Sequence, residues 1–282
     1  MIAMEETNPN DFGAPPTRRQ ALAHQARVLR VIARIEFKLK YADSALGYFW
    51  SVAKPLALFS VLYVVFGRFF KLNAGLKHYP LYLLSGIVLW TFFIDATSLT
   101  LNSMVARGSL LRKLAFPRLV VPMSTTLTAG ITFCVNLIVI AAFIAANRLT
   151  PHLSWLLLIP LLIELYVFTL GVGLILATLF VRFRDVGQVW ELLGQLLFYA
   201  SPIIIPVNYL PPWFQPISFL NPFVQIMQDV RRALIYDMPV TTATSVFGGH
   251  LGHVVPIVIA LATFVVGIIF FRRESPWFAE RV

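Results

Sequence analysis

The sequence contains few charged residues for its length. Only 13% of its 282 residues are charged, whereas 58% are hydrophobic. Soluble domains carry about a quarter charged residues. A soluble fold of this size could bury one large core, but so few charges could not cover its surface. We therefore expect lipid to surround much of the chain, which favours an all-α integral membrane protein.

Cysteine and the common nucleotide and metal motifs are also scarce or absent. The single cysteine, Cys134, excludes an intrachain disulfide and a cysteine-based metal site. There is no Gly-x-x-x-x-Gly-Lys-Ser/Thr loop, so the chain does not bind and hydrolyse ATP in that way, and there is no His-Glu-x-x-His. His250 and His253 lie three residues apart without an obvious third ligand nearby. We expect no catalytic, cofactor or metal site in this chain.

Six apolar stretches are long enough to be considered as membrane spans. A spanning helix needs about 20 predominantly apolar residues. The expected spans are about Lys54–Phe70, Tyr79–Met104, Leu119–Ala146, Ser154–Val181, Val186–Ile205 and Val254–Phe271. They define a transmembrane domain over residues 54–271, followed by a tail over residues 272–282.

The basic residues indicate an orientation. The formal net charge of +10 could signal nucleic-acid binding, but the lysines and arginines lie between apolar runs rather than on a polar surface. With the N-terminus inside, the inner cations outnumber the outer ones by roughly three to one, which follows the positive-inside rule. An even number of spans then puts both termini in the cytoplasm. The cations assigned to outer loops are Arg68, Lys71, Lys77, Arg148, Arg231 and Arg232.

The N-terminal region divides into two parts. Residues 1–20 are polar and lack the apolar stretch of a signal peptide, so we expect a disordered cytoplasmic tail. Residues 21–53 place apolar side chains between basic ones, which predicts an amphipathic helix lying in the membrane interface. The alternative is a generic juxtamembrane helix held by anionic lipid.

Two cytoplasmic connections carry basic residues. In the segment 108–116, basic and apolar residues alternate at helical spacing, and Pro117 ends the pattern. A short helix there could dock into a soluble partner, although an ordinary positive-inside loop would have the same charges. In the tight turn from Arg182 to Val186, we expect Asp185 to cap the following helix.

The outer stretch from Pro202 to about His253 is rich in proline and aromatic residues. We expect two short helices within residues 211–236, over about Pro211–Phe219 and Pro222–Ile235, either dipping into the membrane or lying on its outer face. Irregular backbone at membrane depth must line a cavity or be buried in protein, so a pore mouth is a reasonable hypothesis. A plain extracellular loop is the alternative, but it would not need so many apolar residues.

Acidic residues inside spans are costly and often functional. Asp95 and Glu164 are assigned to span interiors. We interpret both as polar contacts between helices or as groups near an interface. Coupling to an ion gradient is poorly supported.

An ordered set of residues resembles a known family. Its members in chain order are Lys40-Tyr41, Ser44, Leu46-Gly47, Trp50, Lys54-Pro55, Gly86, Trp90, Phe92-Phe93, Arg112-Lys113, Phe116-Pro117-Arg118, Arg182 to Asp185, Ser201-Pro202 and Asn221-Pro222. From about Arg27 to Phe271, the chain resembles the ABC-2 type exporter permeases that move lipid-linked polysaccharides such as O-antigen, teichoic acid, capsule and cell-wall galactan.

The resemblance implies a subunit of the bacterial cytoplasmic membrane that works as a homodimer. Its partners would be two copies of a separate ATPase, which would bind the ATP and Mg, together with membrane lipids and a lipid-linked glycan. The coupling helix to the ATPase would include Leu110, Leu111, Arg112, Lys113, Phe116 and Pro117. The extracytoplasmic gate would include Pro211, Trp213, Phe219, Asn221 and Pro222.

Substrate contacts are predicted on chemical grounds. Sugar rings have apolar faces on which aromatic side chains can stack, so the lining candidates are Trp90, Phe92, Phe93, Phe198 and Tyr199. Each could instead face lipid or another helix. A diphosphate headgroup needs cations at the interface, and the candidates are Arg34, Lys38, Lys40 and Lys54. Anionic lipid would explain these cations equally well.

Two other functions remain open. An exporter of drugs or lipids could share the same fold. A membrane-embedded enzyme acting on polyprenyl-linked sugars would need clustered acidic or histidine residues at one membrane face, which the sequence does not show. The leading interpretation is therefore the permease half of an ATP-driven glycan exporter.

Overall fold

The computed structural model describes residues 49–72, 78–108, 118–236 and 238–281. These residues form helices and connecting turns, and no strand occurs among them. The predicted tail over residues 1–20, most of the predicted amphipathic helix over 21–53 and the core of the predicted coupling segment lie outside the described residues. The all-helical fold class is confirmed.

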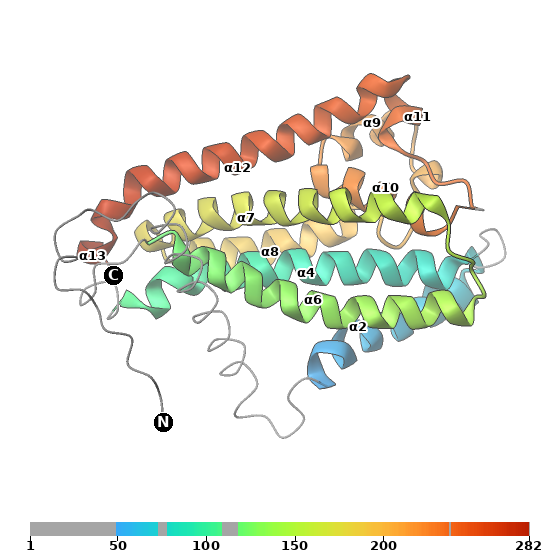
Figure 1. Ribbon diagram of the computed structural model, residues 1–282, viewed down its shortest axis with the longest axis horizontal. Coiled ribbons are helices and arrows are strands. Elements are labelled where there is room, and N and C mark those ends of the chain that lie inside the picture. Colours follow the sequence, from blue (N-terminus) through green and yellow to red (C-terminus); the bar gives the residue numbers. More distant parts are fainter. Residues whose placement is uncertain (1–48, 73–77, 109–117, 237, 282) are drawn as a thin grey trace, which may run out of the picture.

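The long helices run side by side along one direction (Figure 1). They are α2 (Phe49–Leu62), continued by the π-helical turn η2 (Tyr63–Phe69), α4 (Tyr79–Ala106), α6 (Val120–Ala146), α7 (Leu158–Arg182) and α12 (Val254–Glu274). Within the described part of the chain, five helical stretches are long and apolar enough to cross a membrane. Each satisfies its own backbone hydrogen bonds, as a segment in lipid must.

α4 is the centre of the bundle. It contacts α2, α6, α7, α8 (Val186–Ala200) and α10 (Pro222–Leu234). In its most apolar stretch 72% of residues are buried, compared with 22% in α12. Thr100 of α4 hydrogen-bonds Thr126 of α6, with 3.0 Å between the hydroxyl oxygens. α12 instead packs closely against α7 at Gly171 and Gly267, where an added Cβ atom would overlap the facing backbone. Most of the remaining surface of α12 faces outward.

The shorter elements gather at one end of the bundle (Figure 1). They are η3 (Leu153–Leu157), which leads into α7, then η4 (Val207–Tyr209), α9 (Phe214–Phe219), α10, α11 (Ala243–Phe247) and η5 (His250–His253). The opposite end holds the end of α12, η6 (Ser275–Trp277) and α13 (Phe278–Arg281), where Phe278 packs on Phe271 with ring centroids 5.3 Å apart.

Some helix ends and one helix cap differ from the sequence predictions. Helix α2 is already formed at Phe49, the first described residue, ahead of the predicted start at Lys54, and Pro55 is accommodated inside it. α8 ends at Ala200 rather than Ile205. Pro202 has no N–H to continue the helix. The carbonyl oxygens of Pro202 and Ile203 accept hydrogen bonds from Arg231 instead. Asp185 occupies the position before α8, but its side chain makes no capping hydrogen bond.

Candidate functional site

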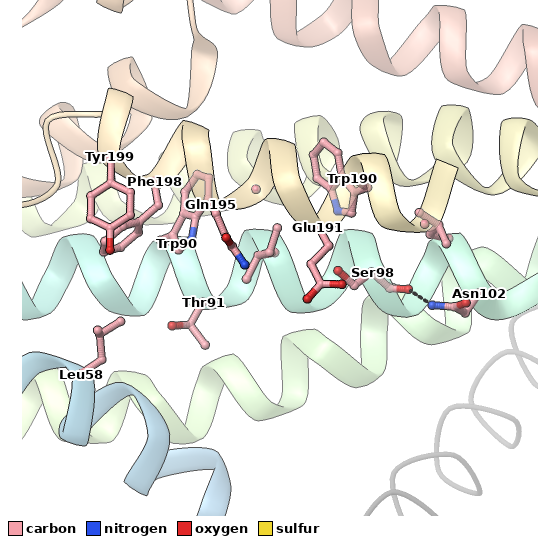
Figure 2. A pocket seen from close by; sticks show the side chains of 14 residues that line it. Leu58, Trp90, Thr91, Ser98, Asn102, Trp190, Glu191, Gln195, Phe198 and Tyr199 are labelled. Carbon is pink, nitrogen blue, oxygen red and sulfur yellow. Dashed lines mark hydrogen bonds between the residues drawn. The ribbon is translucent and has the colours of Figure 1, made fainter. Parts of the chain in front are cut away.

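A groove of about 510 Å³ runs between α4 and α8 and is bordered by α2. The groove is lined by Trp90, Thr91, Ser98 and Asn102 of α4 and by Trp190, Glu191, Gln195 and Tyr199 of α8 (Figure 2). Leu58 of α2 closes one side. The groove is therefore made by three helices from different parts of the chain.

Polar side chains follow one face of α8 along this groove. Glu191, Gln195 and Tyr199 are spaced four residues apart, so they lie above one another on the helix surface, and all three are exposed. Asn102 of α4 is also exposed, and its Nδ2 donates to the Ser98 carbonyl oxygen at 3.0 Å. Lipid would disfavour an exposed carboxylate and two exposed amides within apolar helices. This face is suited to water, a polar ligand or another protein surface.

Three of the five predicted lining aromatics lie at the groove. They are Trp90, Phe198 and Tyr199, and 75% of Tyr199 is exposed. Phe92 and Phe93 instead pack inside the bundle, where Phe92 meets Phe133 and Phe93 meets Phe168 at centroid distances of 4.7 and 5.6 Å. Successive helical residues point about 100° apart, so Phe92, two positions beyond Trp90, points to the other side of α4. Phe93, three positions on, lies beside Trp90, with ring centroids 5.5 Å apart, but packs inward.

The polar groove residues were not predicted from the sequence. Glu191 lies inside the predicted fifth span, so the predicted spans contain a third acidic residue, besides Asp95 in the second span and Glu164 in the fourth. The four-residue spacing of Glu191, Gln195 and Tyr199 in an otherwise apolar helix is the signal that could have identified this face.

Arg231 differs most from its predicted place. Its position in the chain puts it among the outer-loop cations, but its side chain is completely buried on α10. Its Nη1 and Nη2 donate to the carbonyl oxygens of Pro202 and Ile203, each at 2.8 Å. Its Nε donates to the Tyr82 carbonyl oxygen at 3.1 Å. These three bonds join α10 to α4 and to the turn after α8, and they supply the donors that the broken helix lacks.

Gly86 makes room for the Arg231 guanidinium. A Cβ atom at position 86 would overlap Arg231 Nη2. The ring of Tyr82 covers the guanidinium, with the Arg231 Cζ 3.5 Å from the ring centroid. The site therefore depends on a glycine and an aromatic residue one helical turn apart on α4.

α10 also contacts the groove through Phe223. The Phe223 ring packs edge-on against Trp90, with ring centroids 5.2 Å apart, and lies 5.4 Å from Phe93. Asn221 caps α10 by accepting a hydrogen bond from the Phe223 backbone N–H at 3.0 Å, and Pro222 occupies the first helical position. A displacement of α10 would therefore move a ring that supports the groove wall.

The other predicted site residues are distributed as follows. Phe219 is buried at the end of α9, whereas Pro211 and Trp213 are exposed at the same end of the molecule. Lys54 is exposed on α2, one turn after the exposed Trp50. The predicted headgroup residues Arg34, Lys38 and Lys40 and all six predicted coupling residues lie outside the described residues. Beside the coupling segment, Arg107 Nη1 donates to Ser124 Oγ at 3.4 Å, and burial lowers the pKa of the Arg107 guanidinium.

The family comparison and the individual similar proteins agree on one family. Residues 27–235 match the ABC-2 type transporter family. An O-antigen export system permease protein of Klebsiella pneumoniae is 33% identical over 205 residues, covering 72% of this chain and 78% of that protein. A permease of the same description from Myxococcus xanthus is 26% identical over 78% of this chain and 84% of its own length.

A polysialic acid transport protein is similar as well. The polysialic acid transport protein of Escherichia coli is 23% identical over 71% of this chain and 78% of its own length. The family match covers more than half of the chain, and it includes the groove, Arg231 and most of the membrane-spanning helices. The chain belongs to the ABC-2 type transporter family and is a multi-pass membrane protein.

Proposed function

We propose that this chain is the permease subunit of an ATP-driven exporter of a lipid-linked polysaccharide. The groove between α4 and α8 is the observation that carries the proposal, because it combines the exposed ring of Tyr199, and the mostly buried rings of Trp90 and Phe198, with exposed hydrogen-bonding side chains along apolar helices. Rings can stack on the apolar faces of sugars, and Glu191 and Gln195 can bond hydroxyls without requiring one register. Such a surface suits a polymer that slides past it.

Two copies would place their grooves face to face. A single groove is open on one side, and the exposed Leu192 and Leu196 flank its polar residues on α8. A second copy would cover these side chains and enclose the polar ones. In this arrangement α8 and the turn after it complete a sixth crossing, both termini lie in the cytoplasm, and α9 and α10 form the extracytoplasmic gate.

The ATPase would be a separate subunit present in two copies, and it would hold the ATP and Mg. The segment from Leu110 to Pro117 would dock into it, and the basic N-terminal helix would help to receive the anionic headgroup. Replacing Arg112 and Lys113 with glutamate should reduce co-purification of the ATPase. Unchanged association and transport would remove the coupling role from this segment.

Depletion of the protein in its own bacterium tests the transport function. We expect lipid-linked glycan to accumulate inside the cell while surface glycan declines. Restoring the wild-type chain should reverse both effects, whereas a Gln195→Trp variant, which fills the groove, should restore neither. Normal surface glycan without internal accumulation would contradict glycan export. The drug or lipid exporter would then be the remaining candidate, although the similar proteins named above are described for O-antigen and polysialic acid.

A cysteine experiment tests the dimer separately. In a Cys134→Ser background, Leu196→Cys on α8 should form a disulfide-linked dimer upon mild oxidation. Val265→Cys on α12 is the matched control, because it is similarly exposed but lies away from the groove. Cross-linking through position 265 but not 196 would show that the dimer interface lies at α12 rather than α8, and it would contradict our proposal.

A further inference from the structure

A second cavity lies between α7, α10 and the start of α12 and has no part in the proposed export path. Its volume is about 640 Å³, within the range of ligand-binding pockets. One wall is apolar, with Leu157, Leu161 and Ile257 from the two membrane-spanning helices. The other carries Glu164, Gln225 and Arg232. The cavity is thus apolar on one side and polar on the other.

The polar side contains hydrogen-bond acceptors that lack donors. Gln225 is only 1% exposed, and its Nε2 donates to Asp229 Oδ2 at 2.6 Å, but its Oε1 has no partner. Glu164 Oε1 is also buried without a partner. Each buried acceptor left unpaired costs about 1–3 kcal/mol. A ligand that donates hydrogen bonds at this point would remove that cost.

The surrounding charges specify the ligand further. Glu164 lies close enough to Asp229 for the two carboxylates to repel each other. Asp229 is already offset by Gln225, by His253, whose Nδ1 is 3.3 Å from Oδ2, and by the charge of Arg232, whereas Glu164 faces the like charge of Asp229. A cationic donor is therefore favoured between Glu164 and Gln225. No group of three or more histidine, cysteine or acidic residues suited to a metal ion occurs among the described residues. A primary ammonium, with three N–H donors, fits this chemistry.

The edge of the cavity has the opposite charge. Arg232 is exposed there, with its Nη1 3.3 Å from Thr242 Oγ1, and His152 also borders the opening. A phosphate next to the ammonium would meet these groups. Leu156 and Ile159 on α7 and Val258 on α12 are exposed apolar side chains on the membrane-spanning helices nearby. Acyl chains attached to the phosphate could pack along this surface.

We propose that this cavity binds the headgroup of a phospholipid bearing a primary amine, with the ammonium between Glu164 and Gln225 and the phosphate beside Arg232. The occupied site joins α10 to α7 and α12. The inference depends on the chain spanning a membrane, and it does not depend on which substrate is exported. Failure of lipid binding would therefore leave the export proposal intact, and failure of export would leave the lipid site intact.

The test uses the full-length protein reconstituted with defined lipids. Phosphatidylethanolamine and phosphatidylcholine of identical acyl chains are compared by native mass spectrometry, because the quaternary ammonium of choline has no N–H donor. We expect about tenfold stronger retention of phosphatidylethanolamine. Equal retention of the two lipids would overturn the proposal without the need for any variant.

Variants then locate the site. Glu164→Gln removes the carboxylate charge at a partly exposed position, and Gln225→Met removes the buried acceptor with similar side-chain length. Each should lower the preference for phosphatidylethanolamine about tenfold, whereas Glu280→Gln, an exposed carboxylate on α13, should leave it unchanged. An unaltered preference in Glu164→Gln would place the lipid elsewhere. Displacement of the lipid by a soluble oligosaccharide would instead make the cavity a glycan site and refute our assignment.

Discussion

α10 presents two faces with different chemistry to the rest of the molecule. The first face carries Phe223 and Arg231 toward α4, where the Arg231 guanidinium donates to three backbone carbonyls and lies over the Tyr82 ring. The second face carries Gln225, Asp229 and Arg232 toward the second cavity, where Gln225 Oε1 stays unpaired. The first face is complete within the chain, whereas the second still has room for a partner.

The two adjacent arginines provide the strongest test of this difference. Arg231→Met should destabilise the purified protein by at least about 3 kcal/mol, because three buried carbonyl oxygens lose their donors. Arg232→Met should change stability by less than about 1 kcal/mol, since Arg232 is exposed. Thermal unfolding in one detergent measures both. Similar losses in the two variants would contradict the separation of the two faces.

α4, which packs against the first face of α10, and α12, which borders the second, should differ in how well they tolerate an added charge. α4 borders the groove, whereas α12 exposes most of its apolar surface. Val265→Asp near the middle of α12 should lower membrane insertion by about 2.5–3.5 kcal/mol, the cost of a carboxylate in lipid. Thr91→Asp, at a groove position near the middle of α4, should cost much less. The amount of membrane-integrated protein measures this contrast, and equal amounts would mean that the groove also faces lipid.

The packing around Arg231 predicts a smaller effect at Gly86. Gly86→Ala forces the guanidinium to move and should cost about 1–3 kcal/mol, as expected for overpacking. Gly130→Ala on α6 is the control, since a Cβ there meets nothing within 4 Å and alanine is the better helix former. The melting temperature should therefore fall for position 86 and stay constant or rise for position 130. A fall at both positions would point to a general intolerance of glycine replacement.

Apolar run length was sufficient to predict most of the helical framework. α4, α6 and α12 begin within one residue of the predicted positions because a spanning helix is defined by local composition. The two short helices before α11 were also predicted, since Asn221-Pro222 is a local start signal, although α9 begins at Phe214 rather than Pro211.

The features that local sequence patterns do not predict depend on contacts between distant parts of the chain. The end of α8 depends on Arg231, which lies 28 residues after Ile203, and no local rule connects them. The positive-inside rule counts a cation by its place in the chain, so it treated Arg231 and Arg232 alike. The groove residues depend on which side of α8 faces α4. Helical spacing could have separated Trp90 from Phe92, but only the fold shows which of the two faces the groove.

The smallest expected effect concerns Asp229 on the second face. Burial raises the pKa of this carboxyl above its ordinary value of 3.8, while the hydrogen bond from Gln225 and the charges of His253 and Arg232 lower it. Because the folded protein takes up this proton at a higher pH than the unfolded chain, the resulting stabilisation is complete below the ordinary value and is lost as pH rises through the raised pKa. Asp229→Asn should therefore raise the melting temperature slightly at neutral pH.

The difference between wild type and Asp229→Asn reports this titration together with its coupling to Glu164 and His253. It should shrink as the pH is lowered, because the wild-type carboxyl then becomes neutral as well. A bound ammonium would offset the buried charge, so phosphatidylethanolamine should also reduce the difference at neutral pH, whereas phosphatidylcholine should not. A difference that is independent of both pH and lipid would show that Asp229 is already compensated within the chain, and the second face of α10 would then be as complete as the first.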